Sequence, residues 1–172
     1  MLVTVSWWPC IARPSERSLV HPEEWTHPSD GVAVMRSGIR LGAAVVKLPA
    51  VEADLTSVLG PPDRRESLHN RILVWDQLGI FAYQKPDTDV IDTIAVSFRC
   101  SELSFCPKVS YAGVLVVGEA VFWSAAKALD MVRYGFKSDD ISCFRNLGKY
   151  QVSVDCVTGE AGLGIFEIEL KK

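Results

Sequence analysis

The segment HPEEWTHP contains the residue types that most readily suggest metal chemistry. It places His21 and His27 around Glu23 and Glu24, and imidazole and carboxylate groups are common ligands of transition metals. The prolines in the segment keep it out of a helix, so its spacing gives these side chains no common face. We expect an irregular wrap here and neither a metal nor another cofactor. A metal-dependent enzyme that uses this segment stays open as an alternative.

Patterns for other kinds of catalysis are weak. The remaining histidine, His69, lies in the polar segment RRESLHNR, and the sequence lacks the nucleophile elbow, the HExxH motif and the P-loop. Asp87, Asp89 and Asp92 could supply a pair of carboxylates for glycoside hydrolysis. They fall in a predicted turn, however, where aspartate is favoured by local backbone hydrogen bonds. The sequence therefore predicts a protein that is not an enzyme.

The five cysteines do not form a recognisable metal or redox motif. Their number is odd, and no CxxC or Cys/His pair has the spacing of a zinc site. We expect buried free thiols in a reducing compartment, although a disulfide between two of them stays open. The cysteines are Cys10, Cys100, Cys106, Cys143 and Cys156.

Composition and the first residues bear on partners and location. The net charge is -3, with 48% hydrophobic and 23% charged residues; this is typical of a folded globular protein and gives no basic field to attract nucleic acid or an anionic membrane. The N-terminus lacks a basic region and a small-residue cleavage site, and no apolar run approaches the roughly 18 residues that span a bilayer. We expect a cytoplasmic protein, with the periplasm less favoured, and no membrane or nucleic-acid partner.

The elements that would position a site centre on residues 53–98. Apolar residues at helical spacing predict a short helix that ends at Gly60, where Pro61 and Pro62 prevent its continuation. Three runs of strand-forming residues follow, with turns at Leu78-Gly79 and Pro86-Asp87 between them. The runs are Ile72–Asp76, Ile80–Gln84 and Ile91–Phe98. This unit is typical of a helix laid on an antiparallel β-meander.

The same order of elements recurs about 70 to 75 residues later. Gly135 corresponds to Gly60, and Leu147-Gly148 corresponds to Leu78-Gly79. The pattern predicts an α+β fold made of two degenerate repeats, each a short helix packed on an antiparallel β-meander. Residues 1–30 would form an N-terminal strand and irregular wrap, residues 31–100 the first unit and residues 101–172 the second, in one compact domain.

Aromatic and charged residues of the first unit are the candidates for binding a partner. Trp75 and Leu73 lie on one face of their predicted strand. On the next strand, Phe81 and Tyr83 share the face opposite to that of Ile80 and Ala82. One sheet face could therefore expose aromatic anchors, although core packing stays open for them. Acidic side chains would steer a partner's approach, although weak surface ion pairs are the alternative. The candidate residues are Asp63, Arg64, Glu66, Trp75, Asp76, Phe81, Tyr83, Asp87 and Asp89.

The stretch from Gly31 to Gly118 resembles an uncharacterised family of bacterial domains. The resemblance rests on LGPPDRRE, on ILVWDQLGIFAYQKP and on YAGVLVVG. Proteins of this kind are similar to products encoded beside secreted antibacterial toxins, including type VI effectors, where small acidic partners act as immunity proteins. The resemblance implies a cognate toxin as partner, neutralised by occlusion of its active site.

The repeated helix-plus-meander also resembles β-lactamase-inhibitor protein and the small outer-membrane assembly lipoproteins in shape. Because shape alone is weak support for a function, an envelope-assembly adaptor stays open as the alternative. The segment around Cys10 departs from the lipoproteins, since Trp-Trp-Pro precedes the cysteine where a lipobox needs small residues.

Overall fold

The computed structural model describes residues 21–99, 103–123, 128–138, 142–155 and 164–171. The sequence also predicts an edge strand over residues 1–8, a helix cap at Ser124 and a turn at residues 158–160, and these three lie outside the described residues. Within the described residues, no helix has the length and apolar character needed to cross a bilayer.

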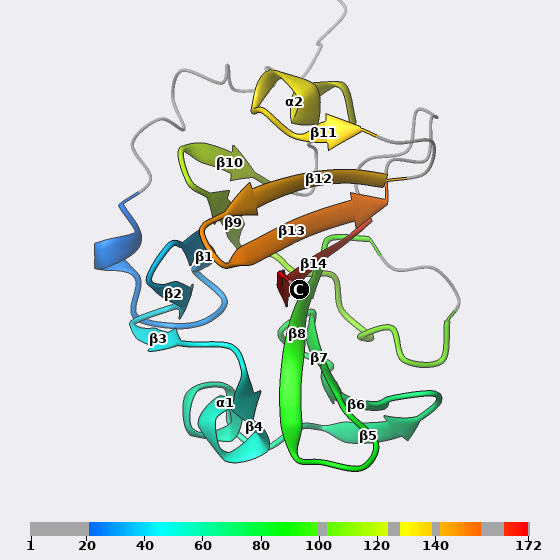
Figure 1. Cartoon of the computed structure of the whole chain (residues 1–172). Coiled ribbons are helices and arrows are strands. Elements are labelled where there is room, and N and C mark those ends of the chain that lie inside the picture. Colours follow the sequence, from blue (N-terminus) through cyan, green and yellow to red (C-terminus); the bar gives the residue numbers. More distant parts are fainter. Residues whose placement is uncertain (1–20, 100–102, 124–127, 139–141, 156–163, 172) are drawn as a thin grey trace, which may run out of the picture.

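Two β-sheets form the body of the molecule (Figure 1). The smaller sheet has the strand order β10-β9-β1-β2-β3, in which β1 and β9 run parallel and the other neighbours run antiparallel. Its strands are β1 (Gly31–Met35), β2 (Gly38–Leu41), β3 (Ala44–Val46), β9 (Val114–Val117) and β10 (Ala120–Phe122). A 3-10 turn, η2 (Pro22–Glu24), precedes β1.

The larger sheet is antiparallel and joins the two halves of the chain. Its order is β11-β12-β13-β14-β8-β7-β6-β5, and β4 pairs with one end of β8. The strands of the first half are β4 (Ala50–Val51), β5 (Arg64–Ser67), β6 (Arg71–Trp75), β7 (Ile80–Gln84) and β8 (Val90–Ser97). Those of the second half are β11 (Lys137–Ser138), β12 (Ser142–Leu147), β13 (Tyr150–Asp155) and β14 (Ile165–Leu170).

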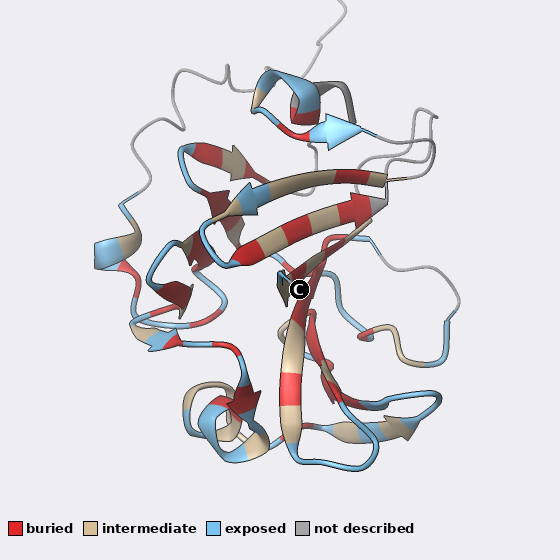
Figure 2. Cartoon of the chain, in the orientation of Figure 1, coloured by how far each residue is buried: buried red, intermediate tan, exposed pale blue. Residues whose placement is uncertain are grey.

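The core lies between the small sheet and the inner face of the large sheet (Figure 2). One continuous buried cluster draws on both sheets and on both halves of the chain, with Ile39, Trp75 and Phe166 among its members. Leu55 of α1 (Glu52–Leu59) and Met131 of α2 (Ala128–Arg133) join the same cluster. Because alternate residues of a strand face opposite ways, the other side chains of the large sheet form a separate outer face.

Local signals explain the start and end of α1. The Asp54 carboxylate accepts a hydrogen bond of 3.0 Å from the Val51 N–H, which satisfies a donor at the start of the helix. Gly60 ends the helix with a φ of 78°, a conformation that glycine adopts without steric cost. The indole N–H of Trp75 then donates to the Gly60 carbonyl at 2.8 Å and ties the helix end to β6.

Gly79 brings the β6–β7 turn against the segment that leads to β9. Its φ is 68°, and a Cβ atom at this position would collide with the backbone nitrogen of Tyr111. The β12–β13 turn contains Gly148, which has a φ of 63°. A Cβ there would make only ordinary contacts with Arg36.

The sequence predicts most of this architecture, and the fold is an α+β fold dominated by strands. The helix after Val51 and the meander strands β6, β7 and β8 lie where the patterns place them. The parity prediction is also confirmed, since Trp75 faces the core with Leu73 while Phe81 and Tyr83 belong to the outer face. The patterns miss the short strands β3, β4, β10 and β11 and the strand character of β5.

Candidate binding groove

Hydrogen bonds from Arg64 link the loop after β8 to the large sheet. Its Nε donates to both carboxylate oxygens of Asp76, at 3.1 and 3.2 Å. Its terminal nitrogens donate to Glu66 and to the backbone carbonyls of Ser104 and Cys106, each at 2.6 Å. Each guanidinium nitrogen therefore has at least one acceptor, and the planar group joins β5, β6 and the loop.

Asp76, which directly follows β6, makes further hydrogen bonds between the sheet and this loop. Its side chain is only 3% exposed, and its Oδ1 accepts a 3.0 Å hydrogen bond from the Lys108 N–H. Its backbone N–H donates to the Asp63 carboxylate at 2.7 Å, and its backbone carbonyl accepts from the Val109 N–H at 3.2 Å. We call Arg64, Asp76 and the backbone of residues 104–109 the loop clamp.

The charges in the clamp stabilise one another. Burial raises the pKa of Asp76, but hydrogen bonds from Arg64 and Lys108 and the attraction of their positive charges outweigh it and leave the pKa below its ordinary value. The hydrogen bond to Asp76 raises the pKa of Arg64, and Glu66 adds to this effect against the opposing effect of burial. The carboxylate therefore stays ionised and paired at neutral pH.

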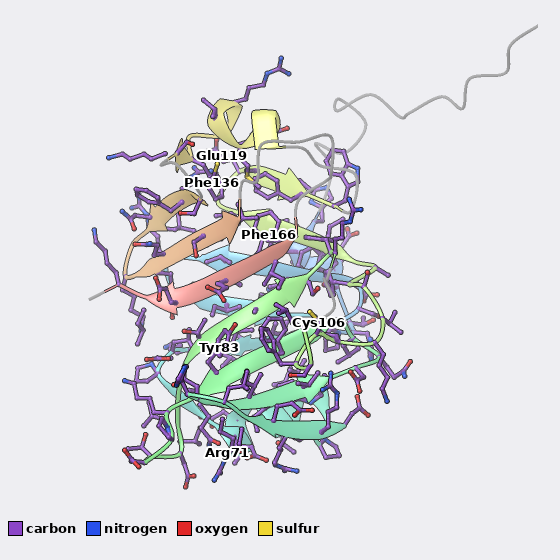
Figure 3. The ribbon with its side chains drawn as sticks, turned by 90° about the vertical axis from the view of Figure 1, so that its right-hand side faces the viewer. Arg71, Tyr83, Cys106, Glu119, Phe136 and Phe166 are labelled. Carbon is purple, nitrogen blue, oxygen red and sulfur yellow. The ribbon has the colours of Figure 1, made fainter. Side chains whose placement is uncertain are left out.

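A groove of about 460 Å³ lies on the outer face of the large sheet, beside the loop that the clamp holds. It extends over strands of both halves, because β14 of the second half pairs with β8 of the first. Its lining residues are Tyr83, Leu103, Phe105, Ser142, Gln151, Ser153, Val154, Ile165 and Glu167. In Figure 3 this face of the sheet is turned to the viewer, with Tyr83 labelled on the sheet and Cys106 in the loop.

One wall of the groove is aromatic and apolar. The Phe105 ring lies 5.7 Å from the Phe81 ring and 6.5 Å from the Tyr83 ring, and Phe81 and Tyr83 make an edge-to-face contact at 5.5 Å. Such contacts fix the orientations of the rings. Ile165 packs against the same cluster, while Leu103 is 49% exposed. The other wall is polar and presents Gln151, Ser153 and Glu167.

The three predicted aromatic anchors differ in exposure: two are buried and one is partly exposed. Trp75 is 2% exposed and Phe81 is 0% exposed, so neither can contact a partner in the folded protein. Trp75 fills the inner core, and Phe81 is covered by the loop that carries Phe105. The prediction of exposed aromatics at these two positions is wrong. Tyr83 is partly exposed and lines the groove.

The predicted charged residues also fall into separate groups. Arg64 and Asp76 belong to the clamp, and the burial of Asp76 contradicts its predicted role as an exposed steering charge. Asp63 and Glu66 bond to members of the clamp from more exposed positions. Asp87 and Asp89 are exposed in the β7–β8 turn and do not line the groove. Their proposed contacts with a partner stay predictions.

The cysteines correct another expectation. Cys106 and Cys143 are disulfide-bonded, so the expectation of free thiols is wrong for both. The other three cysteines lie outside the described residues. Cys143 is buried at 2% exposure in the core, whereas Cys106 is partly exposed in the clamped loop.

Residues 21–28 do not assemble a metal centre in the structure. The Nδ1 atom of His21 pairs with Glu23 at 3.0 Å, and the Nδ1 atom of His27 lies 2.7 Å from the Ser29 hydroxyl. Across the described residues, no group of three or more potential metal ligands comes together.

The sequence patterns do not indicate a binding role for several of the groove residues. Leu103 and Phe105 lie in the segment SELSFCPKVSYAG, which the sequence predicts to be a linker. Glu167 was detectable in principle, because it and Glu169 alternate with the buried residues Phe166 and Ile168 along β14. That alternation marks a strand with one charged face.

The comparisons with known proteins place the chain in a family. A family model described as Domain of unknown function (DUF7738) matches residues 31–130, which is more than half of the chain. The chain belongs to the DUF7738 family. The matched stretch includes the clamp, Tyr83, Leu103 and Phe105, whereas β12, β13 and β14 lie beyond it.

More distant comparisons add little to the DUF7738 match. No curated protein matches the chain. A solved structure of an extracellular protein containing a SCP domain from Bacillus anthracis str. Ames is similar, with 11% identity and a TM-score of 0.47. The alignment covers 72% of this chain and 44% of that one, so the chain spans less than half of the length of that protein. A likeness at this level carries nothing over to the DUF7738 chain.

Proposed function

We propose that this DUF7738 chain is a binding protein without catalytic activity, and that its groove receives a segment of a partner protein. The observation that carries the proposal is the groove itself, a mixed aromatic and polar hollow whose loop wall is held by a buried ion pair. A rigid wall with partly exposed aromatic side chains suits protein recognition, because little side-chain freedom is lost on binding. None of the three histidines lines the groove.

The partner that we propose is a secreted antibacterial toxin, which the chain neutralises by occluding its active site. Support comes from the resemblance of LGPPDRRE and ILVWDQLGIFAYQKP to proteins encoded beside such toxins. The acidic balance of the chain, with a net charge of -3, is compatible with a basic partner.

We propose that this activity takes place in an oxidising compartment and not in the cytoplasm, which the sequence led us to expect. Disulfides persist mainly in such compartments, and Cys106 and Cys143 are both disulfide-bonded. The toxin would then act outside the cytoplasm. The same disulfides favour an envelope-assembly adaptor as the second candidate. An adaptor would co-purify with envelope proteins in cells that carry no toxin.

We also propose that the two halves are degenerate copies of one helix–meander unit. Support comes from the order of the large sheet, where β8-β7-β6-β5 on one side of the junction mirrors β14-β13-β12-β11 on the other. Gly60 and Gly135 have φ values of 78° and 77°, and Gly79 and Gly148 have 68° and 63°. The groove would then lie where the two copies meet.

Survival of bacteria that express the toxin tests the function. The product of the gene adjacent to this chain's gene is exported to the periplasm of a sensitive bacterium, together with the chain or its variants. We expect the wild type to restore growth and Leu103→Asp to fail, since Leu103 is exposed at the groove. Leu68→Asp is the matched control, because Leu68 is 58% exposed at the β5–β6 turn. A neighbour that is harmless, or whose toxicity the chain does not relieve, contradicts the toxin proposal.

A further inference from the structure

The outward side chains around the groove carry negative charge. Two rows of residues cross the sheet at the junction of the halves, as the strand pairing shows. One row is Phe81, Ala95, Glu167 and Ser153, and the next is Tyr83, Thr93, Glu169 and Gln151. Glu167 and Glu169 are the charged residues of β14, whereas Asp92, at the bulge of β8 beside Tyr83, pairs with Lys85 at 3.2 Å. Among the described residues of β7, β8, β13 and β14, neither lysine nor arginine occurs.

The shape of this surface suits a long side chain. Ala95 and Ser153 are small and flank Glu167 in its row, whereas Tyr83 and Phe105 are larger and form the wall. A side chain that enters the groove would therefore have an aromatic face along its stem and a carboxylate close to its end. Glu169 lies two residues from Glu167 on the same face and adds a second negative charge.

We propose that the groove binds the side chain of an arginine presented by the partner protein. This inference rests on the proposed function of the groove as a protein-binding site. A guanidinium group stacks on aromatic rings and forms paired hydrogen bonds with a carboxylate, and its aliphatic stem covers apolar surface. The aromatic wall of Tyr83 and Phe105, the apolar Ile165 and the Glu167 carboxylate supply these three kinds of contact.

Other occupants fit the groove less well. An anionic group would be repelled by Glu167 and Glu169, and a purely apolar side chain would cover Gln151 and Ser153 of the polar wall without offering them hydrogen bonds. Lysine would provide the charge, but it lacks the planar group that stacks on Tyr83 and Phe105.

A charged probe and a neutral probe of the same shape test the inference on the full chain. N-acetyl-arginine methylamide and its uncharged analogue N-acetyl-citrulline methylamide are titrated into the isotope-labelled protein, and amide chemical shifts are recorded by NMR. We expect the arginine probe to shift the amides of β13 and β14 around Ser153 and Glu167, with an affinity at least about tenfold above that of the citrulline probe. Equal affinities, or shifts confined to other surfaces, overturn the inference.

Variants of the groove provide the controls. Glu167→Gln should weaken the arginine probe about tenfold, and Tyr83→Leu should weaken it while keeping an apolar side chain. Glu119→Gln, in the exposed β9–β10 turn, should change nothing. If the arginine probe does not bind while Leu103→Asp still abolishes protection from the toxin, the inference fails and the proposed function stands. If Leu103→Asp protects fully, the groove is not the toxin-binding site.

Discussion

Arg64→Met probes the loop clamp, because it removes the main cation of a buried carboxylate. Asp76 is 3% exposed, and after the substitution its closest remaining cation is the Lys108 Nζ, which lies 3.5 Å away on a side chain that is 72% exposed. Removing one partner of a buried ion pair costs about 3–5 kcal/mol of unfolding free energy. Since Lys108 compensates in part, we expect a loss near the lower end, about 3 kcal/mol.

The neighbouring arginine is a matched control. Arg65 pairs with Glu52 at 2.5 Å, but its side chain is 52% exposed. Arg65→Met should therefore cost less than about 1 kcal/mol. For a protein of this size, about 2–4 °C of the unfolding midpoint corresponds to each kcal/mol, so Arg64→Met should lower the midpoint by roughly 6–12 °C.

Urea unfolding at neutral pH with the disulfides intact measures both variants. Amide hydrogen exchange adds a local readout, because Lys108 and Val109 donate backbone hydrogen bonds to Asp76. These amides should exchange faster in Arg64→Met and remain unchanged in Arg65→Met. Equal losses of unfolding free energy in the two variants would refute the assignment of the clamp as a buried, structure-holding pair.

Three further predictions concern acid, reduction and backbone geometry. Because folding lowers the pKa of Asp76, its stabilising effect is present at neutral pH and is lost as the pH falls through the lowered value. The difference in unfolding free energy between wild type and Asp76→Asn should therefore shrink in acid urea titrations, and a constant difference would contradict this. Reduction of the disulfides at Cys106 and Cys143 should lower the free energy of unfolding by roughly 2–4 kcal/mol per bond, and the unfolding midpoint should fall with it. An unchanged midpoint would contradict the disulfides. Gly148→Ala should cost about 1–2 kcal/mol of unfolding free energy, because the position has a positive φ. Gly79→Ala should destabilise the protein more, because its new Cβ would also collide with the backbone of Tyr111. Equal losses in thermal unfolding would contradict the close approach at Gly79.

Local patterns were sufficient to predict the main strands and α1. Alternating apolar residues, Gly60 and the turn at Gly79 are signals that act within a few residues. Strand β5 was missed because its Arg-Arg-Glu-Ser sequence has no apolar face, and its pairing with β6 is decided by tertiary contacts.

The candidate site depends on contacts that no local pattern contains. Asp76 is buried because Lys108 and the loop cover it from a position 32 residues later in the chain. The same loop covers Phe81 and leaves Tyr83 partly exposed, although both residues share one face of β7. The odd number of cysteines gave no indication of which would form disulfides.

Calorimetric titration of the purified toxin into the chain tests the central claim, that the groove on the outer face of the large sheet binds the partner. The wild type, Leu103→Asp and Leu68→Asp are compared at equal protein concentration and with the disulfides intact. We expect Leu103→Asp to weaken binding by more than about tenfold, and Leu68→Asp to bind as the wild type does. Equal affinity of Leu103→Asp and the wild type would contradict the claim.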